Sequence, residues 1–133
     1  MAGEKILLVE DDLFLRELYN DVLENAGYMV MTASDGEEGL RLGQSNVDAK
    51  LMLLDIMLPK LHGMEVLRQL KANPATSQLP IVLLTNLTEE TIVQEALRLG
   101  AYGYLVKVRY TPQQVVEKVR DFISFHGEHR EVA

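Results

Sequence analysis

The sequence contains no cysteine, has few basic residues and lacks any long hydrophobic run. The absence of cysteine excludes disulfides, zinc sites with cysteine ligands and cysteine nucleophiles. The apolar runs fall far short of the roughly 20 residues that a helix needs to cross a bilayer, so we expect no membrane partner. The first residues, Met1–Lys5, lack the layout of a signal peptide, and we therefore expect a cytoplasmic protein.

Positive charge is scarce, because 13 lysines and arginines stand against 20 aspartates and glutamates. The net charge of −7 opposes the general attraction to phosphates on which nucleic-acid binding depends. The sequence also has no basic patch with interleaved aromatic residues. We therefore expect no nucleic-acid partner. Acidic residues that crowd at one place would instead favour a bound divalent cation.

The 133 residues suffice for one domain with a hydrophobic core. Short apolar runs alternate with segments in which apolar residues recur at helical spacing, which predicts an α/β fold with a doubly wound parallel sheet. The runs are continuously apolar, as expected of strands that helices cover on both faces. They lie near residues 5–10, 28–33, 50–55, 80–85 and 103–107.

The predicted helices begin at residues that suit a helix N-terminus. Asp12 is interpreted as the cap of the first helix, although it could instead share in metal binding. Ser34 or Asp35 can cap the second helix. The third helix is predicted over 63–71, and Pro112 suits the first turn of the fifth.

Polar residues follow four of the predicted strands at the point where each strand ends. Asp55 follows the apolar run Leu51–Leu54, where a buried charge without a partner would be costly. The carboxyl ends of parallel strands meet at one edge of a sheet, where open α/β sheets bind their ligands. The four strand ends therefore predict a single site. Its residues are Glu10 with Asp11, Asp55, Thr85 and Lys107.

The three carboxylates of this set, from Glu10, Asp11 and Asp55, would repel one another without a bound cation. Mg²⁺ suits them best, because it prefers oxygen ligands and retains several waters. We expect Asp11 and Asp55 to be direct ligands and Glu10 to act through a water. The backbone carbonyl of Met57 is expected to face the same ion, because Pro59 stiffens the loop that follows it.

Lys107 and Thr85 add groups that suit a phosphoryl group. The amine supplies a point charge that can pair with Asp55, and the hydroxyl supplies a hydrogen-bond donor. Together with Mg²⁺ they can neutralise charge that is spread over three phosphoryl oxygens. Because a carboxylate can accept a phosphoryl group as an acyl phosphate, the set fits in-line transfer to Asp55.

With these motifs the sequence resembles the receiver domain of two-component response regulators. The resemblance covers about residues 4–126, so we expect a receiver domain over 1–126 and a polar C-terminal tail over 127–133. The motifs are Leu7–Asp12, Leu53–Pro59 with Gly63, Leu84–Thr85 and Gly100–Lys107.

The resemblance implies a flavodoxin-like (βα)5 fold with strand order 2-1-3-4-5. It implies that Asp55 accepts a phosphoryl group, with Mg²⁺ required, from a sensor histidine kinase or a phosphotransfer protein. Thr85 is then expected to move towards the phosphoryl oxygens while Tyr104 rotates inward. The face built from the fourth helix, fifth strand and fifth helix would change its protein partners, in a monomer or weak dimer.

Two positions depart from the family pattern. Val108 stands where the family usually has a proline preceded by a cis peptide bond, which is costly before any other residue, so we expect a differently shaped loop. Asn86 follows the switch threonine Thr85, where a small residue is usual. Its amide could donate to a phosphoryl oxygen or crowd it.

We therefore expect a stand-alone phosphoacceptor switch with no enzymatic activity beyond self-phosphorylation from phosphodonors and slow autodephosphorylation. One alternative is an interaction module of the same fold that works without phosphorylation. The other is a phosphohydrolase with an aspartate nucleophile. Such enzymes commonly have a second acid two residues after the nucleophile, and this chain has Met57 there.

Overall fold

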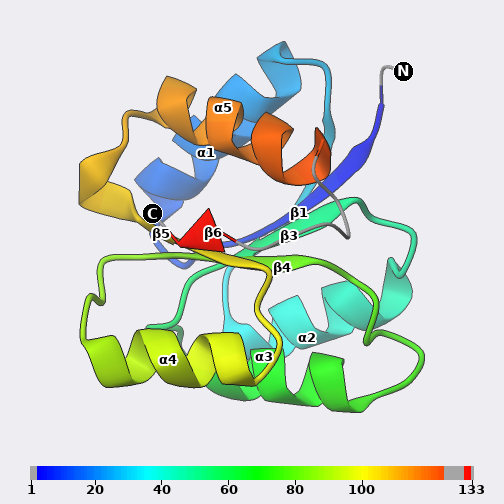
Figure 1. Ribbon diagram of the computed structural model, residues 1–133. Helices are drawn as coiled ribbons and strands as arrows, with labels where there is room; N and C mark the ends of the chain where they lie inside the picture. Colours follow the sequence, from blue (N-terminus) through cyan, green and yellow to red (C-terminus); the bar gives the residue numbers. More distant parts are fainter. Residues whose placement is uncertain (1–2, 125–130, 133) are drawn as a thin grey trace.

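The structure is a computed structural model that describes residues 3–124 and 131–132. One sheet with all strands parallel runs through the middle of the molecule in the order β2-β1-β3-β4-β5-β6 (Figure 1). The strands are β1 (Lys5–Val9), β2 (Met29–Ala33), β3 (Leu51–Leu54), β4 (Ile81–Thr85), β5 (Gly103–Val106) and β6 (Glu131–Val132).

Helices cover the two faces of the sheet, with α1 and α5 on one and α2, α3 and α4 on the other (Figure 1). The predicted α/β, flavodoxin-like fold with strand order 2-1-3-4-5 is therefore confirmed. The helices are α1 (Leu13–Asn25), α2 (Gly36–Ser45), α3 (Gly63–Ala72), α4 (Glu90–Arg98) and α5 (Pro112–Ser124), and a short 3₁₀ helix, η1, spans Lys107–Arg109.

The central strands separate two layers of hydrophobic core. Successive residues of a strand point to opposite faces, so Leu7 and Val9 join the core beneath α2, α3 and α4. Ile6 and Leu8 join the core beneath α1 and α5. Both layers exclude water, which explains why the strand sequences are continuously apolar rather than alternating.

Short side chains cap the first two helices. The Asp12 carboxylate accepts a hydrogen bond from the Leu15 amide at 2.9 Å, which confirms the interpretation of Asp12 as the α1 cap. Between the two candidates for α2, Asp35 is the cap, because its carboxylate accepts from the Glu38 amide at 2.8 Å. These caps fix where each chain segment leaves the sheet edge and turns into a helix.

A sixth strand lies within the polar tail that the sequence predicts over 127–133. Glu131 and Val132 pair with Gly103 and Tyr104 of β5, in parallel, and extend the sheet by one short strand. The rest of the tail lies outside the described residues. In the described part of the chain, no helix combines the length and the apolar character that crossing a membrane requires.

Candidate functional site

The predicted site lies where β1, β3, β4 and β5 end side by side. Val9 pairs with Leu54 in the sheet register, so the residues that follow them, Glu10 and Asp55, are neighbours. Thr85 pairs with Val106, which places Lys107 beside the end of β4. Parallel register thus brings together side chains that are far apart in the sequence.

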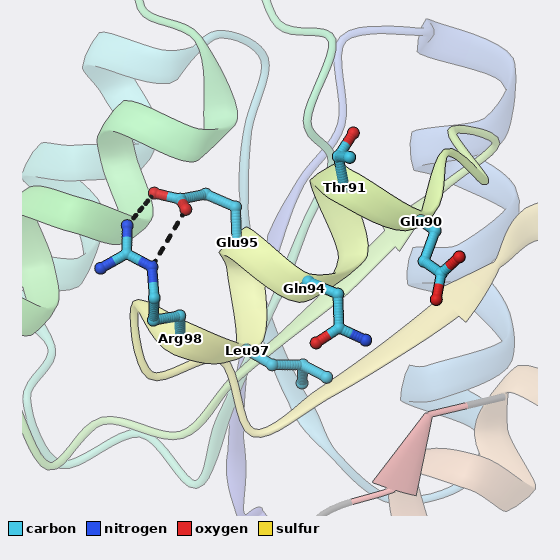
Figure 2. A pocket seen from close by; sticks show the side chains of 6 residues that line it. All are labelled: Glu90, Thr91, Gln94, Glu95, Leu97 and Arg98. Atoms are coloured by element: carbon cyan, nitrogen blue, oxygen red, sulfur yellow. Dashed lines mark hydrogen bonds and ion pairs between the residues drawn. The ribbon is translucent and has the colours of Figure 1, made fainter.

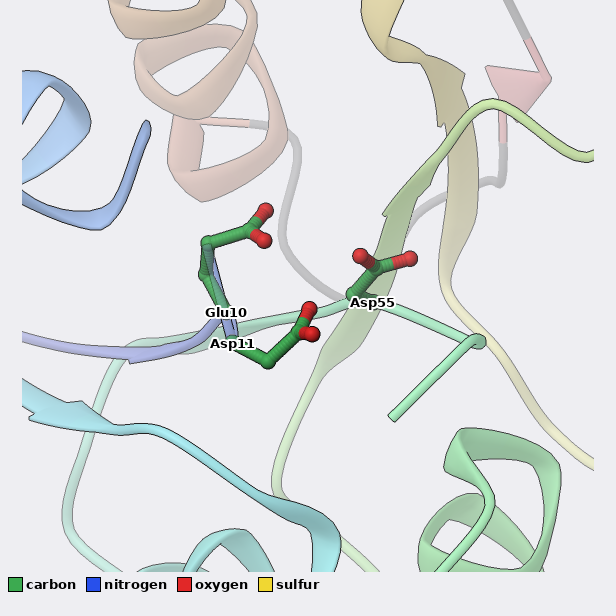
Figure 3. Close-up of side chains that lie close together, drawn as sticks. All are labelled: Glu10, Asp11 and Asp55. Carbon is green, nitrogen blue, oxygen red and sulfur yellow. The ribbon is translucent and has the colours of Figure 1, made fainter. Parts of the chain in front are cut away.

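The carboxylates of Glu10, Asp11 and Asp55 point into a common space (Figure 3). One oxygen from each lies within 4.8 Å of the others. Glu10 and Asp55 are buried, with 2% and 6% exposure, whereas Asp11 is exposed. Three oxygen donors at this separation fit a hard divalent cation such as Mg²⁺, with open positions left for water.

Lys107 bridges two of these carboxylates. Its ammonium nitrogen lies 2.8 Å from Asp55 Oδ2 and 2.5 Å from Glu10 Oε1, and the side chain is nearly buried. Burial lowers the pKa of Lys107, but the hydrogen bonds and negative charges of Asp55 and Glu10 outweigh it and raise the pKa overall. The site therefore holds a permanent positive charge at neutral pH.

The two buried carboxylates also accept hydrogen bonds from backbone amides. Asp55 Oδ1 accepts from the Ile56 amide at 2.7 Å, and Glu10 Oε2 accepts from the Asp12 amide at 3.0 Å. Burial nevertheless raises the pKa of Glu10, because these contacts and Lys107 offset the loss of solvation only in part. The orientation of Asp55 is thus set by one backbone and one side-chain donor.

Gly63 explains how the loop after Asp55 can pack so tightly. The Gly63 amide donates to the carbonyl of Ile56 at 2.8 Å. A Cβ atom on Gly63 would lie 2.1 Å from the Asp55 carbonyl oxygen and 2.6 Å from Ile56 Cα, which no side chain can tolerate. The glycine in the sequence motif is therefore a steric requirement of the β3–α3 loop.

Thr85 and Tyr104 meet at the loop between β4 and α4. Both side chains are buried, and the Tyr104 hydroxyl donates to the Leu87 carbonyl at 2.9 Å. The Leu87 amide donates in turn to Thr85 Oγ1 at 3.4 Å. Desolvation first, and then the charges of Asp55 and Glu89, raise the pKa of Tyr104 to about 12. Tyr104 therefore already has the inward orientation that the resemblance attributes to the switched state.

A pocket of about 340 Å³ opens over the carboxylates, and Met57 and Thr85 contribute to its wall. All five strand-end residues thus line one pocket, as the sequence predicts, and Met57 lies beside them. A larger hollow of about 690 Å³ lies on the outer side of α4, next to the Glu95–Arg98 ion pair (Figure 2). It contains none of the strand-end residues, so the smaller pocket is the candidate site.

Some contacts of this site carry no signal in the sequence. The Leu87 carbonyl and the Ile56 amide are backbone groups, which any residue type other than proline would supply. The departure Asn86 accepts a hydrogen bond from the amide of the other departure, Val108. In residues 3–124 and 131–132 no peptide bond is cis, so the peptide before Val108 is trans, and residues Lys107–Arg109 form η1.

Comparisons with known proteins point to one family. The model of the response regulator receiver domain matches residues 6–120. The chain is 40% identical over 118 residues to the alkaline phosphatase synthesis transcriptional regulatory protein PhoP of Bacillus subtilis (strain 168), covering 89% of this chain and 48% of PhoP. It thus spans about half the length of the curated relatives it matches.

Solved structures agree with the sequence comparison. The chemotaxis protein CheY4 of Vibrio cholerae is 30% identical, with a TM-score of 0.81 over 90% of this chain and 98% of CheY4. The phosphorylated cyanobacterial phytochrome response regulator RcpA is 28% identical, with a TM-score of 0.78 over 96% of each chain. The chain therefore belongs to the receiver domains of two-component response regulators.

Proposed function

We propose that this receiver domain is a phosphoacceptor in which Asp55 takes a phosphoryl group from a sensor histidine kinase or a phosphotransfer protein. The main support is the position of Lys107, whose ammonium contacts Asp55 beside an acidic cluster that suits a divalent cation. An ammonium and a cation on either side of one carboxylate can neutralise the charge that an incoming phosphoryl group brings.

The transfer step needs only positioning and charge. A carboxylate oxygen of Asp55 forms a bond to phosphorus while the bond from phosphorus to the donor nitrogen breaks, and that nitrogen keeps the electron pair. Lys107 then exchanges its contact with the Asp55 oxygen for a contact with a phosphoryl oxygen. Thr85, which lines the same pocket, donates its hydroxyl to another phosphoryl oxygen.

The acidic cluster would hold the metal ion that this step requires. Asp11 and Asp55 would bind Mg²⁺ directly, Glu10 through a water, and Met57 through its backbone carbonyl. The ion supplies positive charge that offsets the charge of the phosphoryl oxygens. Lys107 already pairs with Glu10 and Asp55, so the protein partly compensates its own carboxylates.

The phosphoryl donor is proposed to dock over the pocket mouth. Large apolar side chains are exposed on the segments that leave this edge of the sheet, including Phe14 at 72% and Val108 at 80%. Leu13 and Met57 are also mostly exposed, at 59% and 60%. Apolar surface around a polar site is typical of a protein contact, and it suits a donor presented by another protein.

Phosphorylation is proposed to change the face formed by α4, β5 and α5. The loop that ends in α4 contains Leu87, whose amide contacts Thr85 and whose carbonyl holds Tyr104. A shift of Thr85 towards a phosphoryl oxygen would therefore move the start of α4. The hollow on α4 in Figure 2, with Gln94 and Leu97 in its wall, is available to a protein partner.

Other functions have less support. A phosphohydrolase would need a general acid, and Met57 stands at the usual position. The curated relatives have the names of transcriptional regulators rather than enzymes. Two points stay predictions: that the protein binds no nucleic acid, and that it is a monomer or weak dimer. The relatives are about twice as long as this chain, so their names do not test either point.

The decisive experiment is incubation with phosphoramidate and Mg²⁺, followed by intact-mass measurement. We expect one phosphoryl adduct, which is absent in Asp55→Asn and after chelation of Mg²⁺. Asp48→Asn is the matched control, because Asp48 is an exposed aspartate paired with Lys5 instead of Lys107. Consumption of the donor without an adduct would favour the hydrolase, and no reaction would favour the phosphorylation-independent module.

A further inference from the structure

One hydrogen bond joins the loops that follow β4 and β5 across the pocket. The backbone amide of Val108 donates to the side-chain oxygen of Asn86 at 3.0 Å, over a separation of 22 residues. Asn86 directly follows Thr85, and Val108 directly follows Lys107. The bond therefore ties together the two segments that present the hydroxyl and the ammonium of the site.

The Val108 amide needs an acceptor from outside its own helix. Val108 lies in the first turn of η1, where amide groups have no acceptor within the helix. The bond that closes η1 runs instead from the Tyr110 amide to the Lys107 carbonyl. A proline at position 108 would have no amide hydrogen and would need no such partner. The asparagine thus satisfies a donor that exists only because residue 108 is not proline.

The direction of this bond fixes the orientation of the Asn86 carboxamide. Only its oxygen can accept, so Oδ1 faces Val108 and the Nδ2 amide faces elsewhere. Within the described residues, Nδ2 donates to no protein group, and Asn86 lines the pocket with Asp55 and Lys107. The Asn86 oxygen is therefore occupied by the hydrogen bond from Val108, while the side chain forms part of the pocket wall.

We propose that Asn86 is a positioning residue that holds η1, through the Val108 amide, so that the Lys107 ammonium stays over Asp55 and Glu10. The peptide before Val108 is trans, and the Asn86 bond joins η1 to the loop that follows β4. The proposal rests on the phosphoacceptor function proposed above. It adds that residues 86 and 108 work as a pair, so changing one alone loosens the site.

Amide hydrogen exchange of Val108, measured by NMR on the unphosphorylated full chain, tests the bond itself. In Asn86→Ala we expect exchange to accelerate by about twofold to tenfold, the range for loss of one exposed hydrogen bond. Asn86→Asp keeps an acceptor oxygen and should retain slow exchange. Thr88→Ala, an exposed change in the same loop, is the control. Unchanged exchange in Asn86→Ala would overturn the proposal.

Phosphorylation by phosphoramidate tests the positioning role. In Asn86→Ala we expect the rate at saturating donor to fall by about twofold to tenfold, with the half-saturating concentration unchanged. Asn86→Asp should restore the saturated rate but raise the half-saturating concentration, because its charge repels an anionic donor. A saturated rate in Asn86→Ala equal to wild type, or an Asn86→Asp rate as low as that of Asn86→Ala, would overturn the proposal. If the wild type takes no phosphoryl group, the phosphoacceptor function fails while the exchange measurement still decides the bond.

Discussion

At the scale of single residues, Lys107 determines the charge balance of the site. Its ammonium lies between two buried carboxylates at 2.5 and 2.8 Å, and the same two carboxylates belong to the acidic cluster that could hold a divalent cation. A bound divalent cation would therefore compete with the ammonium for the same negative charge. Because the Coulomb energy of a pair near a protein surface is about 4 kcal/mol at 4 Å, this competition should be measurable.

We predict that Lys107→Met binds Mg²⁺ more tightly than wild type, by roughly tenfold, because Glu10 and Asp55 then lack their ammonium partner. In metal-free buffer the same variant should lose about 2 kcal/mol of unfolding free energy, since Glu10 and Asp55 become unpaired. Calorimetric Mg²⁺ titration and urea unfolding measure the two effects. Lys50→Met, an exposed change just before β3, should show neither effect. Weaker Mg²⁺ binding in Lys107→Met would contradict the competition.

At the scale of elements, the two adjacent aspartates at the junction between β1 and α1 make different contacts. The Asp12 carboxylate turns back to cap α1 through the Leu15 amide. The Asp11 carboxylate lies with Glu10 and Asp55 in the acidic cluster. The cap engages the Asp12 carboxylate at the start of α1, so Asp11 is the member of the pair that joins Glu10 and Asp55.

The two aspartates should respond differently to removal. Asp12→Ala is expected to lower the unfolding free energy by about 1 kcal/mol through loss of the cap and to leave Mg²⁺ affinity nearly unchanged. Asp11→Ala should weaken Mg²⁺ binding by at least about tenfold, with a stability change within about 0.5 kcal/mol. Asp12→Asn, which still accepts from Leu15, is the control for the cap. If Asp12→Ala weakens Mg²⁺ binding as much as Asp11→Ala, Asp12 is a ligand.

At the scale of the whole molecule, Tyr104 links the centre of the core to the loop before α4. Its ring lies in the core layer beneath α2, α3 and α4, while its hydroxyl reaches the Leu87 carbonyl. Burial keeps this hydroxyl protonated, since its pKa is raised from 10.0 to about 12. A group whose pKa is higher in the folded state than in the unfolded state stabilises the fold at pH values below its unfolded-state pKa. This stabilisation is lost as the pH rises through the folded-state pKa.

The stability difference between wild type and Tyr104→Phe should therefore depend on pH. Below pH 10 we expect wild type to be more stable by about 1 kcal/mol, because phenylalanine lacks the hydrogen bond. The advantage should decrease between pH 10 and about 12. Urea unfolding of both proteins across this window measures it. Lys107 is present in both proteins, so its titration cancels in the stability difference between them. A stability difference that does not depend on pH would show that Tyr104 does not titrate as stated.

Much of the architecture could be predicted because its causes are local. Continuous apolar runs identify strands that are covered on both faces, and all five predicted strands are present within one or two residues of the expected bounds. Asp12 and Pro112 mark helix starts through short-range hydrogen bonding and a fixed backbone angle. The rule that parallel strands end at one edge was enough to place Asp55, Glu10 and Lys107 together.

The remaining features depend on atoms that meet only in the folded chain. The choice of Asp35 over Ser34 as a cap, the inward orientation of Tyr104 and the pairing of β6 with β5 have no separate pattern in the sequence. The bond from Val108 to Asn86 is of the same kind, because it needs two loops to reach one place.

The sequence by itself therefore determined the elements, their order along the chain and the chemical types gathered at the sheet edge. The periodicity of apolar residues and the polar residues at strand ends are patterns within a few consecutive residues, so they can be recognised without knowledge of the fold. Only the tertiary structure decided which carboxylate oxygens Lys107 contacts, where the Tyr104 hydroxyl points and how η1 is held. Those outcomes depend on side-chain torsions and loop shapes, which packing between distant segments selects.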